Sequence, residues 1–219
     1  MPFRYPVNLE VEGRCCVVVG GGAVAEQKVR GLLDAGADVR VVAADLCPAL
    51  RALVEAEAVT HVGRAYAAGD LDGALLAIAA TDDPGVNAAV FAEGEKRRVL
   101  VNSVDDIAHC HFSVPSIVRR GDLALTISTG GRAPALSKRL RVQLSEQFGP
   151  EFATVVDVLG DVREEALADR QVDFATWARR WATALNDELI NSIAEGRVDE
   201  ARASLRRSLS EGAPTPHRF

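Results

Sequence analysis

The segment "CCVVVGGGAVAEQKVRGLLDAG" (residues 15–36) constrains the fold more than any other part of this chain. Its first residues form a continuous apolar run, which is typical of a strand covered on both faces. Three glycines follow, and the apolar residues from Ala25 to Leu33 then recur with helical spacing up to a stop signal at Gly36. A strand, a tight turn and a helix in this order predict the first unit of a parallel α/β sheet.

The same alternation continues as far as residue 104. Pro48 and Pro84 are each placed in the first turn of an expected helix. Strands alternating with helices at this spacing predict an α/β fold with a Rossmann-like, doubly wound parallel sheet. The further strands are expected at 37–44, 59–62, 74–81 and 99–104, and the helices at 47–58 and from Asp82 or Asp83 to Arg98.

The pattern changes after Asp105. Two β-like runs, "FSVPSIVRR" and "LALTIST", meet at Gly121–Asp122 and predict a hairpin, which a turn and a helix follow. Only helical patterns remain after Pro150, at 151–168, 173–195 and 197–211. In the second of these, Trp177, Trp181 and Leu185 share one face, and we interpret the two tryptophans as core packing rather than a stacking platform.

We therefore expect three parts in this chain. They are a nucleotide-binding Rossmann-like domain at 1–112, a β-hairpin and helix region at 113–149, and a small all-helical domain at 150–219 that ends in a flexible tail from Gly212.

The glycine turn matches a dinucleotide-binding pattern. Gly20, Gly22 and Ala25 fit G-x-G-x-x-[G/A], in which the first glycine permits the tight turn and the second lets a pyrophosphate approach the backbone. The start of the helix then supplies N–H groups for the phosphates. A purely structural turn is the alternative. The first carboxylate after the second strand is Asp45, and Arg40 is not directly beside it, so NAD is favoured over NADP.

Four loops follow the carboxyl ends of the expected strands, where ligands of such sheets bind. They contain Gly20–Val24, Ala44–Asp45, Thr81–Asp83 and Asn102–Asp106. A carboxylate partly shielded from water at the last of these places, directly after an apolar strand, can accept a proton. Asp105 and Asp106 compete for this role, and a helix cap or a turn residue is the alternative for either.

A basic cluster lies in an otherwise acidic chain, whose net charge is −6. Free backbone N–H groups are expected at "STGGRAP" (128–134), before a helix, and together with the cluster they suit a small polyanion that carries carboxylates. A solvated helix face is the alternative, and we prefer it for Arg139 and Arg141. The cluster consists of Arg119, Arg120, Arg132, Lys138, Arg139 and Arg141, against Asp122 alone.

Charge and composition exclude several classes of protein. The acidic balance argues against general nucleic-acid binding. Neither a signal peptide nor an apolar run of membrane-spanning length is evident, so we expect a cytoplasmic chain with no membrane segment. The four cysteines show no C-x-x-C spacing and are interpreted as reduced thiols.

Taken together, these motifs resemble the precorrin-2 dehydrogenase/sirohydrochlorin ferrochelatase family, the amino-terminal module of siroheme synthase. The stretches "LLAIAATDDPGVN" (75–87), "VNSVDD" (101–106) and "FSVPSIVRRGDLALTISTGGRAPALSKRLR" (112–141) carry most of the resemblance, beside residues 5–42. The resemblance implies NAD-dependent oxidation of precorrin-2 to sirohydrochlorin, either alone or followed by insertion of ferrous iron. It also implies a homodimer that interlocks through residues 113–149, and Asp105 as the catalytic aspartate.

The expected site residues follow from the motifs and the resemblance together. His109 and His111, which come from the H-x-H spacing beside Asp105 and not from the resemblance, are candidates for iron delivery; a loop surface or contact with a substrate carboxylate is the preferred alternative. An NAD-sensing regulatory module is the competing function, although it needs neither the basic cluster nor Asp105.

The expected cofactor-binding residues are Gly20, Gly22, Ala23, Val24, Ala44, Asp45, Thr81, Asn102 and Val104, and the expected substrate-binding residues are Arg119, Arg120, Thr129, Gly130, Gly131, Arg132 and Lys138.

Overall fold

Five parallel strands form the main sheet, in the spatial order β3-β2-β1-β4-β5. The structure is a computed structural model that describes residues 5–168 and 172–211. β1 pairs with β2 on one side and with β4 on the other, all in parallel register. The predicted Rossmann-like sheet is therefore confirmed. The strands are β1 (Cys15–Val19), β2 (Asp38–Val42), β3 (Thr60–Val62), β4 (Leu76–Ala79) and β5 (Leu100–Ser103).

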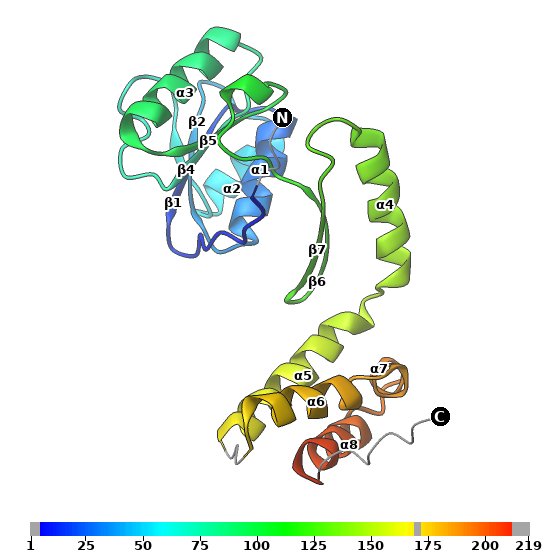
Figure 1. Cartoon of the computed structure of the whole chain (residues 1–219). Coiled ribbons are helices and arrows are strands. Elements are labelled where there is room, and N and C mark those ends of the chain that lie inside the picture. The colour runs from blue at the N-terminus through cyan, green and yellow to red at the C-terminus, as the bar shows by residue number, and fades with distance from the viewer. Residues whose placement is uncertain (1–4, 169–171, 212–219) are drawn as a thin grey trace. The chain divides into compact units, whose positions relative to one another are not determined.

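Helices cover both faces of this sheet (Figure 1). Cys16 and Val18 of β1 pack with residues of α1 (Ala23–Leu33) and of the segment that leads into α2 (Pro48–Glu55). Val17 and Val19 point the other way and join a second cluster with Val90 of α3 (Pro84–Arg97). Alternate residues of one strand thus enter two separate cores, which explains why β1 reads as a continuous apolar run.

α3 begins where the sequence placed a cap. The Asp83 carboxylate accepts hydrogen bonds from the backbone N–H of Gly85 at 2.8 Å and of Val86 at 3.3 Å, and Pro84 occupies the first turn. Asp83, not Asp82, is therefore the N-cap, a contact that contributes about 1 kcal/mol in typical helices. This cap fixes the start of α3.

The chain is grouped into two compact units, Met1–Val114 and Pro115–Phe219. The second unit starts with the predicted hairpin, β6 (Ser116–Arg120) and β7 (Leu123–Ile127), in which Arg120 pairs with Leu123 across the turn. Gly121 in that turn has a φ of +56°, which glycine adopts without steric cost. α4 (Pro134–Gln147) follows and contacts both strands.

Among the described residues of the second unit, α4 is followed by α5 (Glu151–Ala168), α6 (Phe174–Ala184), α7 (Asp187–Ala194) and α8 (Val198–Glu211). The single helix expected at 173–195 is wrong. It breaks at Leu185, because the Asn186 side chain accepts a hydrogen bond from the Leu189 N–H at 2.9 Å and starts a new helix. Trp177 is buried and meets Trp181 edge to face, which confirms core packing, whereas Leu185 is exposed.

The expected flexible tail from Gly212 lies outside the described residues. Within the described part of the chain, no helix is both long enough and apolar enough to cross a bilayer.

Candidate functional site

The three glycines after β1 have different surroundings. A Cβ on Gly20, whose φ is +130°, would lie 2.2 Å from the Ala80 carbonyl oxygen, and a Cβ on Gly21 would lie 1.8 Å from that of Asp45. Both glycines are therefore required by close backbone packing. A Cβ on Gly22 would meet nothing within 4 Å. Only at Gly22 does the turn leave open space that a ligand can enter.

The start of α1 can bind an anion. Gly22 is the N-cap and provides no side-chain hydrogen bond, and the first intrahelical bond runs from Glu26 N–H to Gly22 C=O at 3.0 Å. The N–H groups of Ala23 and Val24 precede that bond and have no partner within the helix. Ala25, the third small residue of the motif, is fully buried against the sheet. This is the geometry of a diphosphate site.

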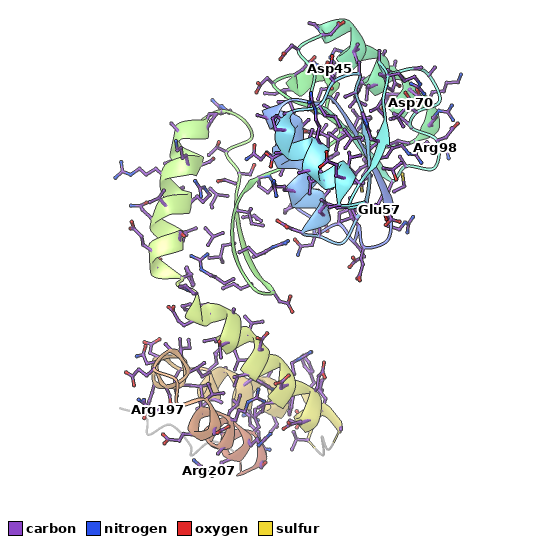
Figure 2. The ribbon with its side chains drawn as sticks, turned by 180° about the vertical axis from the view of Figure 1, so that it is seen from behind. Asp45, Glu57, Asp70, Arg98, Arg197 and Arg207 are labelled. Carbon is purple, nitrogen blue, oxygen red and sulfur yellow. The ribbon has the colours of Figure 1, made fainter. Side chains whose placement is uncertain are left out.

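The loop after β2 is joined to the glycine turn by a backbone hydrogen bond, and the loops after β4 and β5 begin at the same edge of the parallel sheet. Gly20 N–H donates to Val42 C=O at 2.9 Å, and Cys47 N–H donates to Gly21 C=O at 2.8 Å, which joins the loop after β2 to the turn. Asp45 lies in that loop with an exposed side chain (Figure 2). The loop after β4 meets the turn at Ala80, and Val104, after β5, donates to Ala79 C=O at 2.9 Å.

Thr81 forms hydrogen bonds with Asn87, a residue to which the sequence motifs assigned no role. Its hydroxyl donates to Asn87 Oδ1 at 2.8 Å, and Asn87 Nδ2 donates back to the Thr81 carbonyl at 3.0 Å. Asn87 is buried, with 7% of its surface exposed. The sequence signal that could have identified Asn87 is its position: a polar residue one turn into a helix that begins at the edge of the sheet. This pair fixes the loop after β4 to the first turn of α3.

Asp105 sits in a tight turn directly after β5. Asp106 N–H donates to Ser103 C=O at 3.3 Å across this turn, and Asp105 has a φ of +60°. Few residues other than glycine adopt this left-handed conformation, and those that do cluster at functional sites. The prediction that this carboxylate is partly shielded from water is wrong for the single chain, because the structure leaves Asp105 exposed.

The structure separates the two neighbouring aspartates. The Asp106 carboxylate meets His109 Nδ1 at 2.5 Å, and this hydrogen bond lowers the pKa of Asp106. The Asp105 carboxylate forms no ion pair with any residue that the structure describes. Asp106 is therefore held by its own loop, while Asp105 is presented to solvent.

The two histidines have partners within the first unit. Val101 N–H donates to His111 Nδ1 at 2.9 Å, the other ring nitrogen of His111 pairs with Glu95, and both imidazoles contact the Phe91 ring. Over residues 5–168 and 172–211, no group of three or more His, Cys, Asp or Glu side chains is arranged to hold a metal ion. Their suggested role in iron delivery stays a prediction.

Asn102 is buried at the carboxyl end of β5 and contacts the segment that follows the Asp105 turn. It is 9% exposed, and its Nδ2 donates to Phe112 C=O at 3.0 Å and to Cys110 Sγ at 3.4 Å. Its amide nitrogen therefore holds the segment that returns from the Asp105 turn, and the expected contact of Asn102 with the cofactor stays a prediction.

The expected substrate-binding residues lie in the second unit. Thr129 accepts from Ala133 N–H at 3.2 Å and shares a hydrogen bond with the buried Ser137, which orders the turn before α4. Gly130 and Gly131 both have positive φ values in that turn. Arg119, Arg132 and Lys138 are exposed, and none of them forms an ion pair with a described residue.

Arg120 differs from the other expected substrate-binding residues, because its guanidinium forms hydrogen bonds within the protein. Its Nε donates to Phe148 C=O at 2.8 Å, and an Nη donates to Ser145 C=O at 3.0 Å and to the Ser145 hydroxyl at 2.9 Å. These contacts satisfy backbone carbonyls at the end of α4. We therefore leave Arg120 out of the substrate-binding set, because its guanidinium joins the hairpin to the helix.

Comparisons with known proteins agree with this geometry. "Siroheme synthase 1" of Serratia proteamaculans is 38% identical over 208 residues, which are 95% of this chain and 44% of that protein. "Siroheme synthase" of Photobacterium profundum is 36% identical over 200 residues, or 91% of this chain and 42% of that protein. The resemblance to siroheme synthases is thus confirmed, and this chain spans less than half the length of these two relatives.

A solved structure, "SirC, precorrin-2 dehydrogenase", superposes on 93% of this chain and 100% of its own with a TM-score of 0.75 at 24% identity, and so shares the fold. A family model described as "Putative NAD(P)-binding" matches residues 7–116, which include the glycine turn and Asp105. Because that match covers half of the sequence, this chain belongs to the NAD(P)-binding family that the model describes.

Proposed function

We propose that this chain catalyses the NAD-dependent oxidation of precorrin-2 to sirohydrochlorin, in the cytoplasm. One observation carries the proposal: the glycine turn, the loop of Asp45 and the turn of Asp105 converge at one edge of the sheet. The names of the relatives suggest the substrate, since two are siroheme synthases and the structural neighbour is a precorrin-2 dehydrogenase.

The first unit fits a dinucleotide. Gly22 leaves open space beside the start of α1, where the N–H groups of Ala23 and Val24 can receive the diphosphate. Asp45 is exposed in the loop where a ribose hydroxyl binds in such folds, and a carboxylate there disfavours the extra phosphate of NADP. When bound, NAD supplies the acceptor for the hydride.

Asp105 is the proposed general base. Oxidation of precorrin-2 removes a hydride and a proton, so the chain must provide a group that takes the proton. The Asp105 carboxylate is exposed at the same edge as the glycine turn, whereas Asp106 is held by His109. Asp105 is therefore the better acceptor of the two.

The second unit supplies positive charge for the substrate. A reduced tetrapyrrole with carboxylate side chains suits the exposed guanidinium and ammonium groups of Arg119, Arg132 and Lys138, and the backbone N–H groups of the Gly130–Gly131 turn. These residues explain why a chain with a net charge of −6 concentrates basic residues in one segment.

The Asp105→Asn variant tests the proposed base. Asparagine tolerates the left-handed conformation, so the turn should keep its shape while the proton acceptor is lost. We expect kcat to fall at least a hundredfold, since general bases contribute about 10²- to 10⁴-fold, with the Kd for NAD unchanged within about twofold. The matched variant Asp106→Asn should keep kcat within about tenfold. Full activity of Asp105→Asn would contradict the assignment.

We also propose that two copies pair through residues 113–149. Ile117, Leu136 and Val142 of this segment are 41%, 48% and 45% exposed, and a partner that paired through the segment would cover apolar side chains of this kind. A solution mass of twice 23.3 kDa would support this pairing, and a monomer at micromolar concentration would contradict it.

A further inference from the structure

The loop that presents Asp105 is closed at its base by the chain itself. After the turn and a short 3-10 helix (Ile107–His109), the chain returns beside β5, where Asn102 and Cys110 form an antiparallel bridge. His111 N–H donates to Val101 C=O at 2.8 Å, which extends this return by one more backbone contact. The direction of Asp105 is thus set by how tightly residues 103–110 are held.

The Cys110 thiol lies against the backbone of both ends of the Asp105 turn. Its sulfur accepts from Ser103 N–H at 3.2 Å and lies 3.1 Å from the carbonyl oxygens of Ser103 and of Asp106, to either of which the S–H can donate. Ser103 and Asp106 are the first and last residues of the turn, and the backbone bond between them is long, at 3.3 Å. One sulfur atom therefore bridges the turn that the backbone closes weakly.

Two more side chains support the same loop. Asn102 Nδ2 donates to the Phe112 carbonyl at 3.0 Å and approaches Cys110 Sγ at 3.4 Å. His111 Nδ1 accepts from Val101 N–H at 2.9 Å, and its ring stacks on Phe91 with centroids 4.8 Å apart. We call Asn102, Cys110 and His111 the loop clamp. Within it, only the side-chain contacts of Cys110 reach the backbone on both sides of Asp105.

The geometry points to Cys110 as a positioning residue: we propose that its thiol fixes the left-handed turn of Asp105 and so aims the carboxylate at the proton that the reaction removes. This inference rests on the proposed function. A non-glycine residue persists in such a conformation only when its surroundings hold it there, and the clamp provides those surroundings. The thiol itself does not touch the substrate and undergoes no chemistry in this role.

The test compares Cys110→Ala and Cys110→Ser with Cys15→Ala in the full chain. Cys15 opens β1, at the end of the strand opposite the glycine turn, and controls for the loss of a partly buried thiol. For each variant, kcat and KM with precorrin-2, the Kd for NAD and the melting temperature are measured under anaerobic conditions. We expect Cys110→Ala to lower kcat tenfold or more with the Kd for NAD unchanged, and Cys110→Ser to recover part of this loss because a hydroxyl keeps a donor and an acceptor.

A double variant separates positioning from general stability. If Cys110 acts only through Asp105, Cys110→Ala added to Asp105→Asn should cause no further fall in kcat. A wild-type kcat in Cys110→Ala, or a loss of kcat with an equal loss of NAD binding, would overturn the inference. The proposed function fails separately, if the unaltered protein does not oxidise precorrin-2 with NAD, whereas a fully active Asp105→Asn variant would remove only the role of Asp105 as the base.

Discussion

At the scale of single residues, the three glycines of the turn, Gly20 to Gly22, are required for different purposes. Gly20 and Gly21 are required by the protein, because a side chain at either would collide with a backbone carbonyl of the next loop. Gly22 faces open space and has a φ of −87°, which any residue adopts. The fold therefore does not require glycine at this position, and a bound ligand would.

This difference predicts opposite behaviour for two variants. Gly22→Ala should leave the melting temperature unchanged and raise the Kd for NAD about tenfold, equivalent to about 1.4 kcal/mol, because the new methyl group enters the diphosphate site. Gly21→Ala should instead destabilise the fold, since its Cβ would lie 1.8 Å from the Asp45 carbonyl oxygen. Thermal unfolding and titration with NAD check both. Unchanged NAD affinity in Gly22→Ala would mean that the diphosphate does not bind there.

At the scale of elements, the connection between β3 and β4 depends on two buried carboxylates. Asp70 receives two hydrogen bonds from Arg64, at 2.8 and 2.6 Å, and one from Ala67 N–H at 2.8 Å. The hydrogen bonds from Arg64 lower the pKa of Asp70. Burial opposes ionisation of Glu93, but hydrogen bonds from Tyr66 and Gly69 N–H, together with Arg97, outweigh it and lower that pKa as well.

Both shifts predict sensitivity of the first unit to acid. A carboxyl group with a lowered folded-state pKa stabilises the fold fully above its unfolded value, about 4, and loses that contribution as the pH falls through the folded value. The free energy of unfolding of the wild type should therefore decline below about pH 4. Asp70→Asn should be less stable at pH 7 and decline less steeply on acidification.

Denaturant titrations between pH 3 and pH 7 measure this effect. Asp72→Asn, in the same connection, is the matched control, because the Asp72 side chain is 63% exposed and such ion pairs contribute little. If Asp70→Asn and the wild type decline in parallel, the Asp70 network does not cause the acid sensitivity.

The elements also show what the sequence can and cannot reveal. β1 and the start of α3 were predictable because apolar runs and the Asp83–Pro84 cap are local signals. The break before Asn186 was missed because the apolar periodicity continues across it, and the cap depends on one side chain. Arg120 contacts the backbone of Phe148, which is far along the sequence, and Cys110 contacts the backbone of Asp106 because the chain folds back after β5. The spacing of residues in the sequence does not predict such contacts.

At the scale of the whole molecule, the chain divides its proposed tasks between two compact units. The first unit carries the cofactor turn and Asp105, and the second carries the exposed basic residues. Charge reversal in the second unit should therefore affect the tetrapyrrole and leave the dinucleotide unaffected. This separation distinguishes an enzyme from an NAD-sensing module, which has no use for the basic residues.

The double variant Arg132→Glu/Lys138→Glu should raise KM for precorrin-2 at least tenfold, because lost attraction and new repulsion both act on substrate carboxylates. The Kd for NAD should stay within about twofold. Arg207→Glu on α8, an exposed site of the same unit, is the matched control and should behave as the wild type (Figure 2). Equal KM values in the three proteins would remove these residues from the substrate site.

The central claim is tested most directly by anaerobic incubation of the purified protein with precorrin-2, with and without NAD, followed by absorption spectroscopy. The account predicts the spectrum of sirohydrochlorin only when NAD is present, at a rate that depends on the protein concentration. Ferrous ion added to the same mixture then reports whether metal insertion exceeds the rate without protein. Precorrin-2 that remains unchanged in the presence of NAD and active, folded protein would contradict the account and favour a sensing module instead.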